Sequence, residues 1–306
     1  MDTAPITNLW QTKYATAYRQ NEKTIICYRF PHESNREAAL IGKYGLLPGD
    51  RMEYYQTLSC AVERHFSIAE LLHSAGVPNV ISYSKTYQKK ESNGAICVYA
   101  ICDDAITPVT QSLLSEETKA LDVLDMILRL STTILRDVAK PPLSLSLRCL
   151  DLDEVFLTGD NRILLGGFYY ATSPLLSEPP PFLPECPATT PPYSFLESPS
   201  KIGANGADMQ MISLIAWNLF SGLPWNTAHT SASFRIHPQH APTSLLEVLK
   251  VGLCGKDQDC SVFRKQLLQC RKELAKTEFA DIIIPFPTPM EKQYQYNHSR
   301  QQPDGI

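Results

Sequence analysis

Glycine is scarce in this 306-residue chain, which contains 14 glycines and none among residues 1–41. A glycine-rich loop that binds phosphate needs several glycines close together, because its backbone must approach the phosphates closely. Residues 1–41 therefore contain no loop of this kind. Charged residues are also few, at 20% of the chain against a usual share of roughly 25%. With 43% hydrophobic residues, the composition is typical of a globular protein with a substantial core.

Neither sign of charge dominates the chain. It has 28 Lys and Arg residues against 32 Asp and Glu residues, a formal net charge of −4. Proteins that bind nucleic acid or anionic lipid through charge carry a basic excess. We therefore expect no nucleic acid among the partners of this protein.

Long hydrophobic runs are also missing. The longest charge-free stretch, residues 209–234, is interrupted by asparagine, glycine, proline and histidine, and its apolar part is far shorter than the ~20 residues of a membrane span. Residues 1–5 contain neither the basic nor the apolar segment of a secretory signal. We expect a protein without a membrane span or a secretory signal.

Cysteine pairs with the spacing of a zinc or redox site do not occur. The nine cysteines are an odd number, and no two of them have C-x-x-C spacing. This pattern favours reduced thiols in a cytoplasmic protein. His229, His237 and His240 lie near one another, but no nearby cysteine or acidic residue completes a metal-ligand set. We favour a proline-rich surface loop over a metal site there, and predict no metal and no cofactor.

The first hundred residues have the pattern of strands around one helix. Residues 24–30 are β-branched and aromatic, which predicts a strand. A helix is predicted from Asp50 as N-cap, with apolar residues at helical spacing, to the stop signal at 76–78. Residues 80–87 and 95–102 then form a predicted strand pair.

The rest of the chain is predicted to be mostly helical. An amphipathic helix begins at residues 115–117 and extends to 138, and two short strands at 154–157 and 162–165 form a hairpin. Three further helices, a proline-rich loop and a polar tail follow: 209–220, which is apolar nearly all round, 244–253, 261–274, the loop 172–200 and the tail 285–306, which we expect to be disordered.

This order of elements resembles the protein kinase fold, and five short strings at matching spacing support the resemblance. Residues 147–157, LRCLDLDEVFL, are similar to the kinase catalytic loop HRDLKPENIFL, and residues 163–168, ILLGGF, to the IKLGDF that leads into the DFG motif. Residues 208–214 and 221–225 are similar to the D-x-W-S-x-G helix and its exit, and residues 76–80 are similar to the HPNI turn. Glu197, which lies 11 residues before Asp208, is similar to the APE glutamate.

The resemblance covers roughly residues 10–275 and implies an α+β, bilobal fold. Residues 1–102 would form the small β-rich N-lobe, and residues 103–284 the larger helical C-lobe, with loop 172–200 in place of the activation segment.

The same resemblance implies that the catalytic positions have been replaced. Cys149 stands at the catalytic aspartate, Glu154 at the cation-binding asparagine and Gly167 at the DFG aspartate. At the position of the family's phosphate-binding lysine, on the third strand, this chain has either Arg29 or Tyr28. We favour Arg29, because Cys27 then takes the small-residue position facing the nucleotide.

The structural residues of the family are retained in this resemblance. Arg148 matches the HRD arginine, Phe168 the DFG phenylalanine and Glu197 the APE glutamate. Asp208 matches the buried aspartate that accepts backbone N–H groups of the catalytic loop, and Glu63 is the candidate for the helix C glutamate.

A retained scaffold without its chemistry predicts a pseudokinase, which acts as a regulatory scaffold by binding a protein partner, such as an active kinase or another regulatory protein. Phosphoryl transfer needs an aspartate at the hydroxyl, metal ligands and a lysine on the phosphates. One alternative is a divergent serine/threonine-type kinase that uses Glu154 with Asp151 or Asp153. Another is an unrelated α+β interaction module.

Two further interpretations concern single features. Cys149 as a nucleophile would need a nearby base, and no histidine occurs between His73 and His229, so an inert small residue is favoured. The proline-rich loop is expected either to occlude the vacant substrate groove or to carry the partner contact, because its prolines favour an extended conformation suited to docking. The alternative is an exposed connector that only spans the cleft.

Overall fold

The structure is a computed structural model of the chain. It describes residues 7–12, 15–20, 22–30, 50–92, 94–111, 117–147, 150, 152–169, 171–176, 204–222, 241–254 and 259–284. Two antiparallel sheets and several helices make it an α+β protein, as predicted. The chain divides into two compact units, Met1–Val109 with Asp137–Pro191 and Thr110–Arg136 with Pro192–Ile306. Residues 155–165, which form the hairpin described below, belong to the same unit as the N-terminal sheet.

The first unit is built on a five-stranded antiparallel sheet. Its strands lie in the order β1-β2-β3-β5-β4, with β3 and β5 in the interior. The strand bounds are Thr7–Gln11 (β1), Ala15–Gln20 (β2), Lys23–Phe30 (β3), Lys85–Lys90 (β4) and Ile96–Cys102 (β5). The side chains of Ile26, Val98 and Ala100 are fully buried, as expected for alternate residues that face a core from interior strands.

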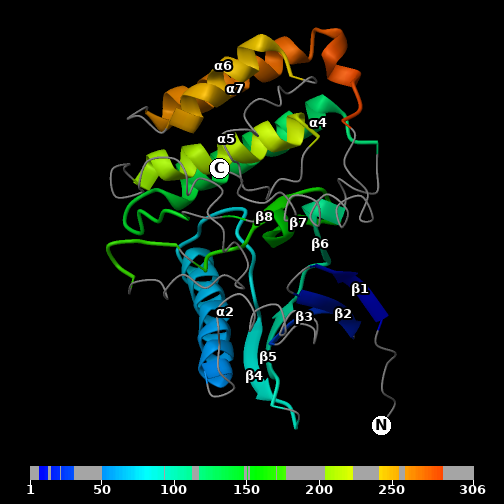
Figure 1. Cartoon of the computed structure of the whole chain (residues 1–306), viewed down its shortest axis with the longest axis vertical. Coiled ribbons are helices and arrows are strands. Elements are labelled where there is room, and N and C mark those ends of the chain that lie inside the picture. Colours follow the sequence, from blue (N-terminus) through cyan, green and yellow to red (C-terminus); the bar gives the residue numbers. More distant parts are fainter. Residues whose placement is uncertain are drawn as a thin grey trace, which may run out of the picture. The chain divides into compact units, whose positions relative to one another are not determined.

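One helix covers a face of this sheet. Helix α2, Asp50–Ser74, runs alongside β4 and β5 (Figure 1). Val62, Phe66, Ala69 and Leu72 recur at helical spacing and are buried, so this stripe of the helix faces the sheet. The helix ends before Gly76, whose φ of 72° lies in the left-handed region that glycine adopts without strain. The predicted helix and its stop are confirmed.

The predicted strands are confirmed, with one large change of bounds. The strand expected at 80–87 begins only at Lys85 and continues to Lys90. Residues 80–84 begin instead with a β-bridge between Val80 and Leu165. The sequence pattern did not delimit β1, β2 or the short strand Ile106–Pro108.

A second, three-stranded sheet belongs to the same unit. Its order is β6-β7-β8, with bounds Ile106–Pro108, Val155–Thr158 and Ile163–Leu165. The indole N–H of Trp10 on β1 donates to the carbonyl oxygen of Ile106 at 2.7 Å. The amide of Leu165 donates to the Asn79 carbonyl at 2.8 Å, and the amide of Ile81 donates to the Leu165 carbonyl at 3.0 Å. These bonds connect the hairpin to the first sheet and to the turn after α2.

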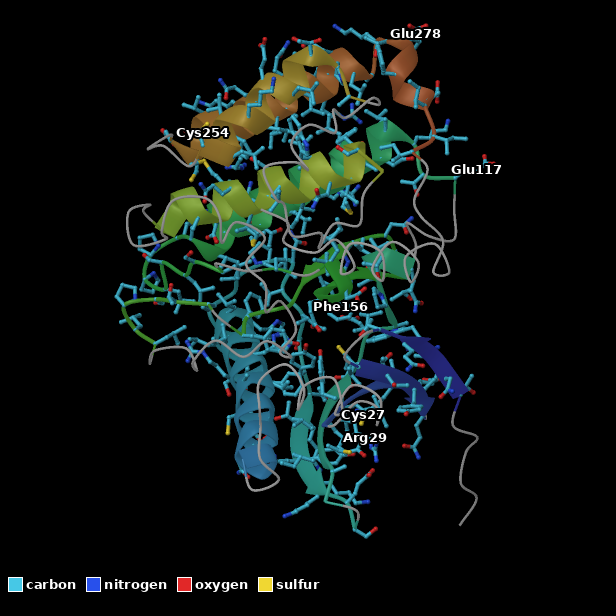
Figure 2. All side chains as sticks on the ribbon, in the orientation of Figure 1. Cys27, Arg29, Glu117, Phe156, Cys254 and Glu278 are labelled. Atoms are coloured by element: carbon cyan, nitrogen blue, oxygen red, sulfur yellow. The ribbon has the colours of Figure 1, made fainter. Side chains whose placement is uncertain are left out.

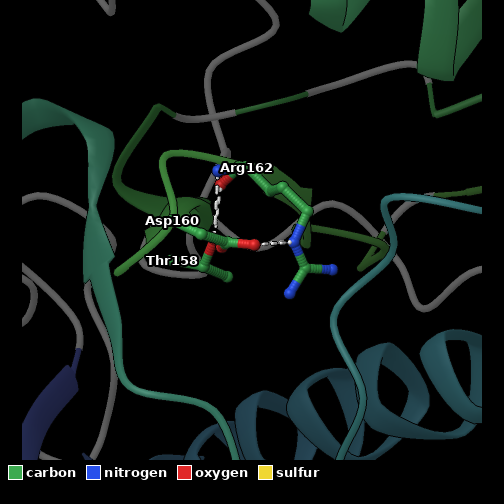
Figure 3. Close-up of polar contacts among 3 residues, drawn as sticks. All are labelled: Thr158, Asp160 and Arg162. Carbon is green, nitrogen blue, oxygen red and sulfur yellow. Dashed lines mark hydrogen bonds and ion pairs between the residues drawn. The ribbon is translucent and has the colours of Figure 1, made fainter.

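The β7–β8 turn has its own polar contacts. Asp160 accepts hydrogen bonds from the Thr158 hydroxyl and from Nε of Arg162, the latter at 2.7 Å (Figure 3). These two contacts, the Thr158 hydroxyl foremost, lower the pKa of the Asp160 carboxyl. The amide of Thr158 also donates to the Arg162 carbonyl at 3.0 Å, which closes the turn. The predicted hairpin is confirmed, and its closed turn fixes the register of the two strands.

Among the residues that the structure describes, the second unit contains four α-helices. They are α4 (Ala120–Thr132, continued as a π-helical turn to Val138), α5 (Ala204–Phe220), α6 (Thr243–Cys254) and α7 (Cys260–Leu274). Contacts join α4 to α5, α5 to α6, α6 to α7 and α7 back to α4, so α6 and α7 form a layer on the other two helices (Figure 1). Arg271 and Asp125 form an ion pair between α7 and α4, with 2.8 Å from Nε to Oδ1.

The helix predictions agree with this unit. Every residue from 207 to 220 on α5 is buried, as its apolar character on all sides predicted. Helix α4 begins at Ala120 rather than at residues 115–117. In the part of the chain that the structure describes, no helix is both long enough and apolar enough to cross a membrane.

The contact between α5 and α6 yields a stability prediction. A Cβ atom on Gly252 would collide with the Ser213 hydroxyl and lie 2.8 Å from Cε2 of Phe263. Overpacking of this kind costs about 1–3 kcal/mol, which exceeds the gain of up to about 1 kcal/mol in helix propensity. Gly252→Ala should therefore lower the free energy of unfolding measured with urea.

A second glycine provides the control. No atom lies within 4 Å of a Cβ built on Gly159, so Gly159→Ala should change stability by less than about 0.5 kcal/mol. A Gly252→Ala variant as stable as the parent would contradict the described packing of α5 on α6.

Candidate functional site

A buried tyrosine and a buried glutamate meet where the first sheet approaches the hairpin. Tyr28 on β3 has no exposed surface, and Glu154, at the end of the 3₁₀ turn Leu152–Glu154, is 1% exposed. The Tyr28 hydroxyl lies 3.1 Å and 3.4 Å from the two carboxylate oxygens of Glu154 and donates to them. The Tyr28 ring packs edge-on against Phe66 of α2, with ring centroids 5.7 Å apart. Tyr28 thus contacts both the helix and the segment that leads into β7.

Arg29 lies on the opposite face of the sheet, because successive residues of a strand alternate. Its guanidinium forms an ion pair with Glu91 at 2.9 Å, and this hydrogen bond raises the pKa of Arg29. Of the two predicted candidates, Tyr28 rather than Arg29 is therefore the residue that reaches Glu154.

Cys27 faces the same side of the sheet as Arg29, away from α2. It lies next to Arg29 on β3 (Figure 2). In the register with β5, Cys27 is opposite Tyr99 and Arg29 is opposite Cys97, so all four residues share that face. Burial raises the pKa of Cys27 to about 12, so its thiol is protonated at neutral pH.

Next to the pair of Tyr28 and Glu154 lies a buried histidine that the sequence pattern had not singled out. The Nδ1 atom of His65 on α2 accepts the backbone N–H of Phe168 at 3.1 Å, and its Nε2 is 2.8 Å from the Tyr83 hydroxyl oxygen. Because Nδ1 accepts, the neutral ring carries its proton on Nε2 and donates it to Tyr83. The ring also packs against Phe168 and Tyr169, with centroids 5.8 Å and 4.8 Å away.

The surroundings of His65 determine its protonation state. It is fully buried, and burial lowers its pKa to about 3, so the ring is neutral at pH 7. Burial, reinforced by nearby Tyr28 and Glu154, raises the pKa of Tyr83 well above its usual range. Tyr28 and Tyr83 both pack against Phe66, with ring centroids 5.7 Å and 4.7 Å away, so the two polar pairs are neighbours. We call these four residues the buried polar cluster: Tyr28, Glu154 and His65, which are buried, and Tyr83, which is partly exposed.

Two consecutive glycines allow the chain after β8 to pass close to Glu154. A Cβ on Gly166 would lie 2.8 Å from the Glu154 carbonyl oxygen, to which the Gly166 amide donates at 2.9 Å. Gly167 has a φ of 77°, and a Cβ there would lie 3.1 Å from Cδ1 of Leu150 and 3.3 Å from Cβ of Glu154. A side chain at residue 167 would therefore be strained and crowded.

The other predicted residues fall into three groups. Phe168 is fully buried, as expected of a core filler, and Asp208 on α5 is also fully buried, as predicted. Glu63 is exposed on α2, and the structure does not bring it to the buried polar cluster. Several predictions fall on residues outside the described ones: Arg148, Cys149, Asp151, Glu197, His229, His237, His240, the tail 285–306 and all of loop 172–200 beyond residue 176.

The hydrogen bonds of the cluster hold together segments that are distant in sequence. The carboxylate of Glu154 accepts a hydrogen bond from Tyr28, and both ring nitrogens of His65 have partners. Among the described residues, no group of three or more His, Cys, Asp or Glu side chains has the geometry to hold a metal ion.

Comparisons with known proteins found no relative: no model of a protein family matches the chain, and none of the curated proteins is significantly similar to it.

Sequence alone contained a signal for His65. The residue lies in the stripe formed by Val62, Phe66 and Ala69, so its burial follows from helical periodicity. Its partners Tyr83 and Phe168 are 18 and 103 residues away and could not be inferred from that pattern.

The low pKa of His65 predicts a loss of stability in acid. The unfolded chain binds a proton at this histidine below about pH 6.5, whereas the folded protein does so only near pH 3. Stability is therefore complete above pH 6.5 and falls as the pH falls, by about 2 kcal/mol at pH 5. His65→Gln, which cannot titrate, should lose about 2 kcal/mol less than the parent between pH 7 and pH 5 in urea unfolding.

His73→Gln, at an exposed position of the same helix, should keep the parental pH dependence. Histidine NMR signals provide a test that does not require the variant to fold. In the parent, the His65 ring should stay neutral at pH 5; a His65 signal that titrates near pH 6.5 would contradict the described burial.

Proposed function

We propose that this chain has a bilobal, protein-kinase-like fold and acts as a pseudokinase, binding a protein partner as a regulatory scaffold without transferring phosphate. Three features support the fold. A helix lies between the third and fourth strands of an antiparallel sheet, a β-hairpin follows the second long helix, and helix α5 is buried on every side.

The hydrogen bond between Tyr28 and Glu154 is the observation that carries the proposed lack of activity. In the kinase resemblance, Glu154 stands at the position of the cation-binding asparagine. For the position of the phosphate-binding lysine we propose Tyr28 in place of Arg29, which the sequence favoured, because Tyr28 is the residue that reaches Glu154. Here they are bonded to each other and buried. Tyrosine brings no positive charge to screen a triphosphate, and a Glu154 carboxylate engaged by Tyr28 would have to be uncovered before it could bind a cation.

Gly167 supports the same conclusion. A kinase needs a carboxylate at this position to hold Mg²⁺, and glycine has none. The backbone conformation and the nearby Leu150 and Glu154 leave little room for a replacement. The loss of each of these groups removes roughly several kcal/mol of transition-state stabilisation.

A protein that keeps a kinase scaffold without a nucleotide site acts through its surfaces. We propose a protein partner, such as an active kinase or another regulatory protein, and a location in the cytoplasm. The divergent-kinase alternative would require Glu154 to leave Tyr28.

ATP with Mg²⁺ should leave the melting temperature unchanged. A ligand at about a hundredfold excess over its Kd stabilises by about 2.7 kcal/mol, which for a unit of this size corresponds to a rise of roughly 5–10 °C. Thermal unfolding with about 1 mM ATP–Mg²⁺, with ATP and a chelator, and without nucleotide should give the same midpoint within about 1 °C.

A rise of several degrees that requires Mg²⁺ would contradict the proposed lack of a nucleotide site. Transfer of phosphate to a generic protein substrate, abolished by Glu154→Gln, would replace the proposal with the divergent kinase.

A further inference from the structure

Strand β4 forms an open edge of the first sheet. It is paired with β5 residue for residue, from Lys85 opposite Ile101 to Lys90 opposite Ile96. All six of its residues are exposed. Among the described residues, no strand pairs with its other side. The opposite edge, β1, is less regular, because its register shifts between Asn8 and Trp10.

The hydrogen-bonding groups that β4 presents outward follow from its register. In an antiparallel pair, every second residue exchanges both backbone bonds with its partner, and the residues between them point theirs the other way. The amide of Glu91 donates to the Ala95 carbonyl at 2.8 Å, which marks the odd-numbered residues as those bonded to β5. The amides and carbonyls of Thr86, Gln88 and Lys90 therefore point toward the open side.

The side chains of β4 give this edge a chemical character. Lys85, Tyr87 and Lys89 share the face away from α2, because Gln88 between them points to α2 and donates to Ser59 at 2.9 Å. Tyr87 is 42% exposed and stacks on Tyr99 of β5, with ring centroids 4.9 Å apart and an interplanar angle of 12°. The Lys85 ammonium lies 5.8 Å from the Tyr87 ring centre.

The lysines of β4 have no carboxylate partner among the described residues, whose ion pairs involve other cations: Lys23, Arg29, Lys119, Arg162 and Arg271. The edge is thus a basic stripe in a chain whose net charge is −4.

This pattern selects the kind of strand that can pair with β4. Lysines on an edge strand deter pairing with another copy of the same strand, because like charges would face each other. They attract a strand whose acidic residues lie on the same face. A nucleic acid or a lipid surface would be attracted by the lysines, but neither has a regular row of amide and carbonyl groups to pair with the edge of the strand.

We propose that β4 is the docking edge for an extended acidic segment of a partner protein, which adds to the sheet as a further strand. Its acidic residues would lie beside Lys85 and Lys89, and an apolar residue between them would cover Tyr87. Its backbone would pair with Thr86 and Gln88. The proposal rests on the sheet alone and does not depend on the kinase-like fold.

A labelled peptide tests this pairing directly. A blocked heptapeptide of threonines, with glutamate second and sixth and valine in the middle, places two carboxylates and an apolar side chain on one face. Fluorescence anisotropy should detect saturable binding below about 1 mM. Lys85→Glu combined with Lys89→Glu should weaken binding about tenfold or more.

Two controls separate strand pairing from charge attraction. Lys265→Glu with Lys272→Glu, at exposed positions on α7, changes the net charge equally and should leave the affinity within about twofold. The same peptide N-methylated on the third and fifth residues keeps its charges but loses the amides that would pair with the edge, and it should bind about tenfold more weakly or not at all.

Three results would overturn the proposal: no saturable peptide binding, equal binding of the N-methylated peptide, or equal weakening by the α7 substitutions. Binding of an oligo-thymidine or of phosphatidylserine vesicles through Lys85 and Lys89, without peptide binding, would assign the basic edge to a different class of partner.

Discussion

The hydrogen bond from Tyr28 to Glu154 is the constraint on which the first unit depends. A buried carboxylate is costly unless its oxygens have partners, so the chain must deliver a donor from the sheet to the segment before β7. Strand β3 does this by directing Tyr28 toward α2, where Phe66 supports its ring. The two glycines after β8 then let the backbone close over Glu154, and the Phe168 amide meets His65.

The interior and the edge of the sheet have opposite properties. In the interior, polar groups are bonded to one another and the thiols of Cys27 and Cys102 are held protonated by burial, with pKa values raised to about 12. At the edge, β4 presents regular backbone groups and lysines without carboxylate partners among the described residues. This division fits our proposal that the protein acts by binding a partner through its surface.

Periodicity predicted the elements of this fold more accurately than it predicted the contacts of single residues. The β-branched and aromatic residues of β3, the stop after α2 and the turn of the β7–β8 hairpin are local signals, and all three are confirmed. The face to which Arg29 and Tyr28 point depends on which side of the sheet α2 covers, and a single strand contains no such information. Likewise, the partners of His65 depend on segments distant in sequence, so the pattern could indicate its burial but not its hydrogen bonds.

A double-mutant cycle on Tyr28 and Glu154 tests the central claim most directly. Urea unfolding of Tyr28→Phe, Glu154→Met and the double variant should give a coupling free energy of about 1–3 kcal/mol, because each single change leaves a buried group without its partner. The same cycle on the partly exposed pair Arg29 and Glu91 should give less than about 1 kcal/mol. Effects at Tyr28 and Glu154 that add within about 0.5 kcal/mol would contradict the account.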